Sequence, residues 1–247
     1  MTTTPVPAPL LALDTILAET WPAAETCTLG PLTLRRSPGG GQRVQAASLT
    51  GEALPTAQTL TTAAEIMDDW GQTPLYRVDD GQEGFDTLLD GAGYVQCDPT
   101  VLRIGHLAPL LAIEVPPVSN FSIWPPLAII QDMWRTAGHG PDRIAVMHRV
   151  PGARTALLAR HTDRPVGVSF VATSGKTAVV HALDVVPTFR GQGIARRMMA
   201  RAARWAQAQG LTRIAALVTT DNTPAQKLYQ SLGMEPAGGY HYRRLKR

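Results

Sequence analysis

The hydrophobic positions of the chain follow a helical period in some stretches and a strand period in others. Apolar residues at helical spacing, with turn signals at the ends, predict helices over residues 56–70, 85–92, 127–137, 141–149 and 192–209. Strand-forming runs predict strands over 75–78, 101–104, 155–161, 165–173, 177–186, 211–219 and 240–245. Helices alternate with strands in the second half, so the predicted fold class is α/β (α+β) with a mixed sheet.

The N-terminal half predicts a smaller α+β unit that begins with a hairpin. A strand over 26–36 is followed by the turn Ser37-Pro38-Gly39-Gly40-Gly41 and by a returning strand over 43–49. The glycines invite comparison with a phosphate loop, but no helix start is predicted behind them. A hairpin turn is therefore the favoured interpretation.

A proline-rich segment predicts a boundary between two units. Residues 112–126 contain Pro116, Pro117, Pro125 and Pro126, which divides the chain into 1–115 and 116–247. Charge changes sign there, from 5 Lys+Arg against 14 Asp+Glu to 18 against 6. The acidic unit can dock on the basic one, and the basic one attracts polyanions such as coenzyme A or nucleic acid. Its arginines lie mostly on helix faces without interleaved aromatics, which makes nucleic acid the weaker partner.

Cellular context is predicted from features that are missing. The apolar run 10–13 stops at Asp14 with no basic segment before it, so no signal peptide is expected. No apolar stretch approaches the roughly 20 residues of a membrane span. Two cysteines, Cys27 and Cys97, suggest a reducing cytoplasm without a disulfide framework. The histidines show no ligand spacing, so no metal site is predicted.

The strongest chemical signal is a strand, a glycine turn and a helix over residues 183–209. The strand ends at Pro187, and Arg190-Gly191-Gln192-Gly193-Ile194-Ala195 leads into an arginine-rich amphipathic run. Glycines let the backbone approach a ligand closely, and free N–H groups at a helix start attract phosphate oxygens. The turn is neither a Rossmann fingerprint, since Arg196 stands where a third glycine is needed, nor a Walker A loop.

Two motifs resemble the GNAT superfamily of acetyl-CoA-dependent N-acetyltransferases. Arg190-x-x-Gly193-x-Ala195 fits the family's Gln/Arg-x-x-Gly-x-Gly/Ala signature, and Asp221 to Met234 is similar to its asparagine, helix and "LY..LGF" segment. The strand over 181–190 is similar to that of the arylalkylamine N-acetyltransferases. The resemblance implies a GNAT fold with a mostly antiparallel sheet. A faint echo of 228–234 in 85–94 suggests that the N-terminal unit is a degenerate GNAT-like half, as in tandem members.

The resemblance also implies which residues bind the donor. The pyrophosphate of acetyl-CoA is expected on the N–H groups of Arg190, Gly191, Gln192, Gly193, Ile194 and Ala195. Main-chain N–H groups of Leu183 and Val185 are expected to face the acyl and pantetheine part, on a strand that splays from its neighbour. Asn222 is expected to cap its helix, bind the cofactor arm, or do both.

Two side chains are candidates for proton transfer. Tyr229 occupies the family's tyrosine position, where its hydroxyl would protonate the leaving CoA thiolate. His181 is the candidate general base, because strand alternation places residues 181, 183 and 185 on one face and Asp184 on the other. A water or Glu114 could serve instead; packing alone would also explain either side chain.

The expected reaction is direct acetyl transfer to a primary amine in a ternary complex. The acceptor is a small-molecule or peptide amine that the sequence does not identify. The sequence is also compatible with a homodimer. A silent acyl-CoA-binding module and a longer acyl donor stay open as alternatives. A nucleic-acid-binding protein is the third reading and predicts salt-dependent binding to random DNA.

Overall fold

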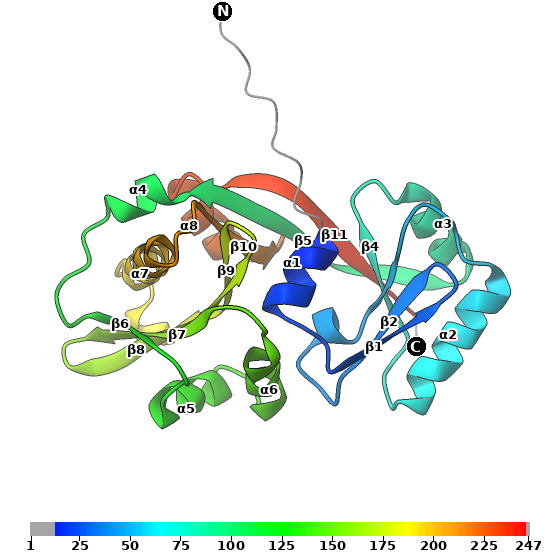
Figure 1. Ribbon diagram of the computed structural model, residues 1–247, viewed down its shortest axis with the longest axis horizontal. Coiled ribbons are helices and arrows are strands. Elements are labelled where there is room, and N and C mark those ends of the chain that lie inside the picture. Colours follow the sequence, from blue (N-terminus) through cyan, green and yellow to red (C-terminus); the bar gives the residue numbers. More distant parts are fainter. Residues whose placement is uncertain (1–12, 246–247) are drawn as a thin grey trace, which may run out of the picture.

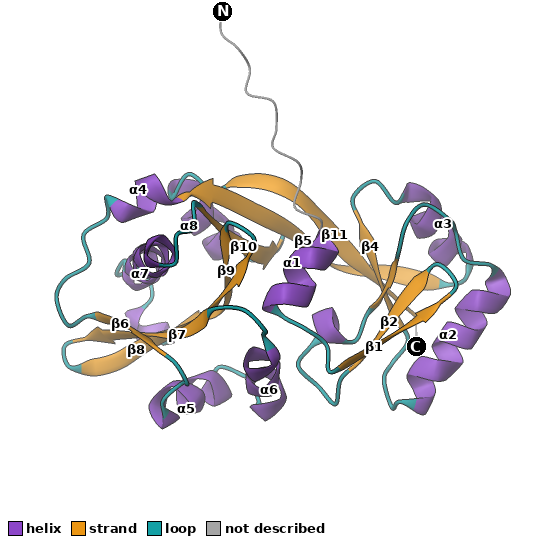
Figure 2. Ribbon diagram, in the orientation of Figure 1, coloured by secondary structure: helices purple, strands orange, loops and turns teal. Residues whose placement is uncertain are grey.

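The computed structural model describes residues 13–245, which form one sheet of eleven strands flanked by helices (Figures 1 and 2). The strands lie in the order β1-β2-β3-β4-β11-β5-β10-β9-β8-β7-β6. Their bounds are β1 Glu25–Leu29, β2 Leu32–Arg36, β3 Ala47–Leu49, β4 Leu75–Asp79, β5 Tyr94–His106, β6 Asn120–Ile123, β7 Arg154–His161, β8 Arg164–Ser174, β9 Thr177–Val185, β10 Arg213–Thr219 and β11 Glu235–Leu245.

Eight α-helices and two short 3-10 helices complete the described chain. They are α1 Leu13–Thr20, η1 Gln42–Val44, α2 Ala57–Asp69, α3 Glu83–Gly91, α4 Leu107–Leu111, α5 Ala128–Thr136, α6 Pro141–Arg149, η2 Pro187–Phe189, α7 Ile194–Ala208 and α8 Thr223–Ser231. None of these described helices is long and apolar enough to cross a bilayer.

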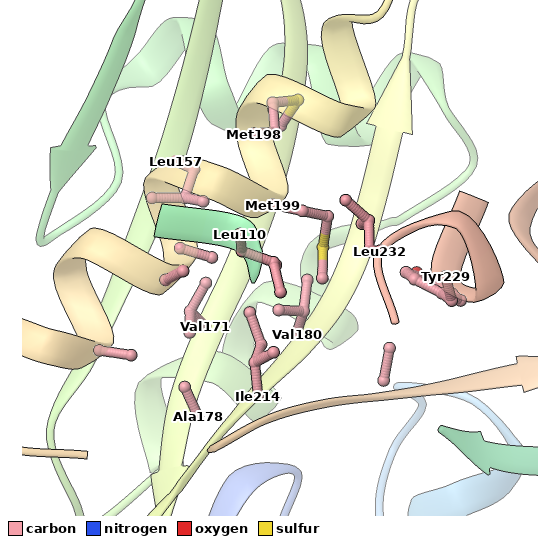
Figure 3. Close-up of a cluster of buried hydrophobic side chains, with 14 of the residues drawn as sticks. Leu110, Leu157, Val171, Ala178, Val180, Met198, Met199, Ile214, Tyr229 and Leu232 are labelled. Atoms are coloured by element: carbon pink, nitrogen blue, oxygen red, sulfur yellow. The ribbon is translucent and has the colours of Figure 1, made fainter. Parts of the chain in front are cut away.

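Helices cover both faces of the C-terminal part of the sheet (Figure 1). On one face, α7 buries Ile194, Met198 and Ala202 in a cluster that also contains Val180 of β9 and Tyr229 of α8 (Figure 3). On the other face, α5 and α6 pack in a separate cluster with strands β7 and β8. The amphipathic α7 therefore buries its apolar side against the sheet, and the sheet separates two apolar clusters.

The two halves of the chain exchange strands in the middle of the sheet. Strand β5 of the first half lies between β10 and β11, and its residues 100–106 pair with β10. Strand β11 lies between β4 and β5, and its residues 240–244 pair with β4. The sheet therefore runs without a break across the division predicted at 115/116. The division into two domains stays a prediction.

Three local predictions before residue 127 are wrong or incomplete. Residues 25–36 form a complete hairpin, β1–β2, that turns at Gly30-Pro31. The segment 37–41 is a loop leading into η1, and only residues 47–49 form the returning strand. The predicted boundary segment contains strand β6, which pairs with β7. A loop of glycines cannot be told from a hairpin turn by composition, because both need left-handed backbone conformations.

Candidate active site

A row of main-chain N–H groups is exposed where α7 begins. Gly191 and Gly193 adopt φ values of 76° and 74°, a left-handed conformation that glycine tolerates without strain. None of the N–H groups of residues 191–196 donates to an acceptor within the described chain. These N–H groups lie at the positive end of a 15-residue helix, where phosphate oxygens are favoured, and their binding of a pyrophosphate stays a prediction.

Arg190 takes part in this region through its side chain. Its Nε donates to the Val185 carbonyl at 2.9 Å, and its Nη2 pairs with Asp184 at 3.3 Å. The guanidinium therefore ties the end of β9 to the turn before α7. Asp184 is engaged in this pair and does not line the cleft described next.

A cleft of about 400 Å³ opens where β9 and β10 diverge. The two parallel strands pair only from Thr177/Arg213 to Val180/Ala216. Beyond that point, Leu183 on one strand and residues 217–219 on the other line the cleft. The expected splay between these strands is therefore present, and it leaves the facing edge of β9 without a strand partner in the described chain.

A β-bulge interrupts β9 inside this cleft. The register with β8 shifts between Val168 and Phe170, and Ala182 adopts φ 46° while its carbonyl accepts a hydrogen bond from Trp134 Nε1 at 3.0 Å. A bulge adds one residue and so reverses the alternation that follows it. The prediction that His181 shares a face with residues 183 and 185 is therefore wrong. Val185 faces α7, whereas His181 packs with Trp21 and Phe170 on the opposite side.

His181 nevertheless lines the cleft, and its hydrogen bond defines its tautomer. Thr20 donates its hydroxyl proton to the Ile16 carbonyl at 2.6 Å, so its oxygen can only accept from His181 Nε2 at 3.0 Å. The proton then sits on Nε2, and Nδ1 is a buried acceptor without a partner among the described residues. Burial, helped by the charge of Arg43, lowers the pKa of His181 well below its usual range.

The stability of the protein should reflect this buried neutral imidazole. Because the folded-state pKa of His181 is lowered, the unfolded chain binds a proton first as the pH falls below about 6.5. The free energy of unfolding should then decrease, by at most about 1.4 kcal/mol per pH unit for one group. Denaturant unfolding between pH 7.5 and 5 measures this slope, and His181→Gln should reduce it. An equally stable protein at pH 5 and pH 7 would contradict the burial.

Tyr229 presents a protonated hydroxyl to the cleft. Its ring is buried beside Leu232 in the α7 cluster (Figure 3), yet no hydrogen bond joins the hydroxyl to another described residue. Burial raises the pKa of Tyr229 to about 12, against the opposing charge of Arg43. The group therefore carries its proton at neutral pH and is free to donate it.

Asn222 is confirmed as the N-cap of α8. Its Oδ1 accepts from the Ala225 N–H at 3.2 Å, ahead of a proline in the first turn of the helix. The same residue lines the cleft, so its amide nitrogen stays available to a ligand. Glu114, the alternative base, is exposed and does not line the cleft.

Several cleft residues lie outside every motif in the sequence. The opposite wall consists of Trp21, residues 40–43, His139 and Arg143, joined by Tyr240 and Tyr242 of β11. A Cβ on Gly40 would lie 2.6 Å from Val146 of α6, so the glycine loop packs directly against that helix. No sequence signal identifies these residues, because they converge from four segments that are far apart in the chain.

Comparisons with known proteins point to one family. Residues 124–234 match the model of the acetyltransferase (GNAT) family. A stretch of 62 residues, 25% of this chain, is 32% identical to an aminoglycoside N(6')-acetyltransferase type 1 of Salmonella typhimurium and spans 43% of that relative.

Solved structures show the fold over most of the chain. A GCN5-related N-acetyltransferase from Kribbella flavida superimposes with a TM-score of 0.69 at 18% identity, covering 91% of this chain and 90% of that one. A tandem GNAT protein from the clavulanic acid biosynthesis pathway gives 0.58 at 16% identity, covering 75% and 68%. At these identities the likeness concerns the fold, and the predicted GNAT fold is confirmed. Residues 124–234 therefore match the acetyltransferase (GNAT) family model, and the chain has the fold of that family.

Proposed function

We propose that this protein transfers an acetyl group from acetyl-CoA to a primary amine by direct attack in a ternary complex. The observation that carries the proposal is the split between β9 and β10, which connects the two faces of the sheet at Tyr229 and His181. The donor would lie on the α7 face with its pyrophosphate on the N–H groups of residues 191–195. The acceptor would enter from the face of α5 and α6.

The chemistry needs a neutral amine, a stabilised oxyanion and a proton for the thiolate. The amine nitrogen attacks the thioester carbon, and the tetrahedral intermediate collapses as the C–S bond breaks. Tyr229 would give its proton to the departing sulfur; its raised pKa keeps the hydroxyl protonated, although the same shift makes it a weaker acid. The edge of β9 at Leu183 would supply N–H groups to the acyl oxygen.

His181 is the proposed acceptor of the amine proton through its unpartnered Nδ1. Its lowered pKa keeps it unprotonated near neutrality, which a base requires, although the same shift makes it a weak one. The proton would leave the site by a water exchanged through the cleft. We assign His181 this role because it is the unprotonated, cleft-lining imidazole on the acceptor side without a competing donor.

We also propose that the N-terminal half is a degenerate GNAT-like unit. The order β3-α2-β4-α3-β5 repeats as β9-α7-β10-α8-β11, and β3/β4 and β9/β10 are both parallel pairs. The turn before α2 lacks a counterpart of Arg190-x-x-Gly193-x-Ala195, and Arg36-x-x-Gly39-x-Gly41, which fits the signature literally, lies in the loop before η1. It would therefore complete the sheet and the acceptor wall without binding acetyl-CoA.

Release of free CoA from acetyl-CoA in the presence of an amine panel tests the proposed reaction. Amine-dependent release, with the acetylated amine identified by mass, is the expected result. Acetyl-CoA binding without release for any amine would make the chain a silent acyl-CoA-binding module. Faster release from a longer acyl-CoA would reassign the donor.

A further inference from the structure

Two guanidinium groups line the acceptor side of the cleft without a carboxylate partner. Arg43 Nε donates to the Tyr240 hydroxyl at 3.0 Å, and Nη2 donates to the Leu217 carbonyl at 3.4 Å. Arg143 of α6 donates from Nη1 to His139 Nδ1. Within residues 13–245, neither guanidinium forms an ion pair.

No carboxylate of the described cleft residues offsets these charges, although, against the raising effect of burial, Arg43 lowers the pKa of the Tyr240 hydroxyl. Asp98 is the one carboxylate among the described lining residues, and it lies half-exposed, where it accepts from Gln42 and pairs with Arg244 at 3.7 Å. Burial and the charge of Arg143 lower the pKa of His139, so its neutral imidazole is favoured and offsets no positive charge. Burial and the charge of Arg43 lower the pKa of Arg143 itself. The cleft thus holds two neighbouring cations that an anion would stabilise.

Coenzyme A does not supply that anion in the proposed arrangement. Its phosphates are placed on the α7 face, near Gly193, whereas α6 belongs to the cluster on the other side of the sheet. A polycationic acceptor would instead be repelled by Arg43 and Arg143. The partner of these guanidinium groups must then be part of the acceptor.

Resting on the proposed function, we infer that the acceptor is an amine that carries an anionic group, a carboxylate or a phosphate, held by Arg43 and Arg143. Guanidinium groups match both anions by paired hydrogen bonds. An anion at this position would leave the amine free to point toward the split between the strands, where Tyr229 and His181 lie. α-Amino acids and aminoalkyl phosphates fit this description, whereas aminoglycosides and polyamines do not.

Matched pairs of acceptors test the inference in the CoA-release assay. L-Amino acids are compared with their α-amides, 2-aminoethyl phosphate with ethanolamine, and both sets with spermidine and kanamycin. We expect at least one anionic acceptor to exceed its uncharged partner by about 10-fold or more in kcat/KM, as one hydrogen-bonded charge would give. The comparison of amino acids with amides tests a carboxylate, and the comparison of 2-aminoethyl phosphate with ethanolamine tests a phosphate, so together they identify the anion that the site binds.

Arg143→Gln is the deciding variant, and Arg149→Gln on the same helix is its matched control. Arg149 does not line the cleft and donates to the Pro22 carbonyl at 3.3 Å, so its loss removes a charge from the same helix but no guanidinium from the cleft. Arg143→Gln should raise KM for the anionic acceptor about 10- to 100-fold and leave its uncharged partner unchanged. An equal loss with all acceptors, or a preference for amides, spermidine or kanamycin, would overturn the inference.

Failure of acetyl transfer itself is separable from failure of this inference. If no amine releases CoA, the proposed reaction fails, and calorimetry of the same acids and phosphates with the CoA-saturated protein decides the anion site. Binding that Arg143→Gln abolishes and Arg149→Gln retains would support the site. Absence of binding by every anion would overturn it.

Discussion

Replacing Gly193 by glutamate should abolish measurable acetyl-CoA binding. Gly193 has φ 74°, and a Cβ there would lie 3.2 Å from the Arg197 guanidinium, so the turn must change shape. The N–H groups of residues 191–196 would lose their common direction, and the new carboxylate would repel the pyrophosphate. Loss of two hydrogen bonds to a charged ligand corresponds to about 100-fold or more in Kd. Isothermal titration with acetyl-CoA measures this effect.

Gly210→Glu is the matched control for that variant. Gly210 also has a left-handed φ, 72°, has open space where a Cβ would stand, and follows the other end of α7. It therefore carries the same backbone strain and added charge without touching the cradle. Acetyl-CoA binding should persist in Gly210→Glu, and unchanged affinity in Gly193→Glu would contradict the cradle.

Replacing Tyr229 by phenylalanine should lower the turnover number while acetyl-CoA still binds. The hydroxyl has no hydrogen-bond partner among residues 13–245 to lose, so the buried ring and the thermal midpoint should be retained. A missing general acid typically costs about 10²- to 10⁴-fold in rate. Single-turnover acetyl transfer at saturating acetyl-CoA gives this loss directly.

The pH dependence of the Tyr229 variant adds an independent check. Because the pKa of Tyr229 is raised to about 12, the wild-type rate should show no limb from this group between pH 6 and 10. Acetyl donors with a more acidic leaving thiol than CoA would need no proton on the departing sulfur, so an acetyl thioester of a nitrothiophenol should restore the activity of the variant. Full activity of Tyr229→Phe with acetyl-CoA would remove the hydroxyl from the reaction.

Local sequence patterns predict the helices around the proposed acetyl-CoA site, because residues close together in the sequence determine where these helices begin and end. The expected helix over 192–209 is observed as α7, Ile194–Ala208, and the helix over 141–149 as α6, Pro141–Arg149. A glycine before an amphipathic run and Asn222 before Thr223-Pro224 determine where helices begin. The donor motif is therefore readable from neighbouring residues alone.

The acceptor side is not readable in this way, because tertiary contacts form it. The bulge at Ala182 depends on Trp134, which lies 48 positions earlier, and strand alternation therefore misplaces His181. Arg43 meets Tyr240 across 197 positions. The length of β5 and its position between β10 and β11 also depend on partners outside the local sequence.

The interlocked strands β5 and β11 determine whether the two halves of the chain can fold as separate fragments. A fragment ending at 115 would hold β4 and β5 with a gap between them, and one beginning at 116 would hold β10 and β11 with the same gap. Each fragment would expose unpaired strand edges, which favours aggregation. Separately expressed halves should thus recover structure only when mixed.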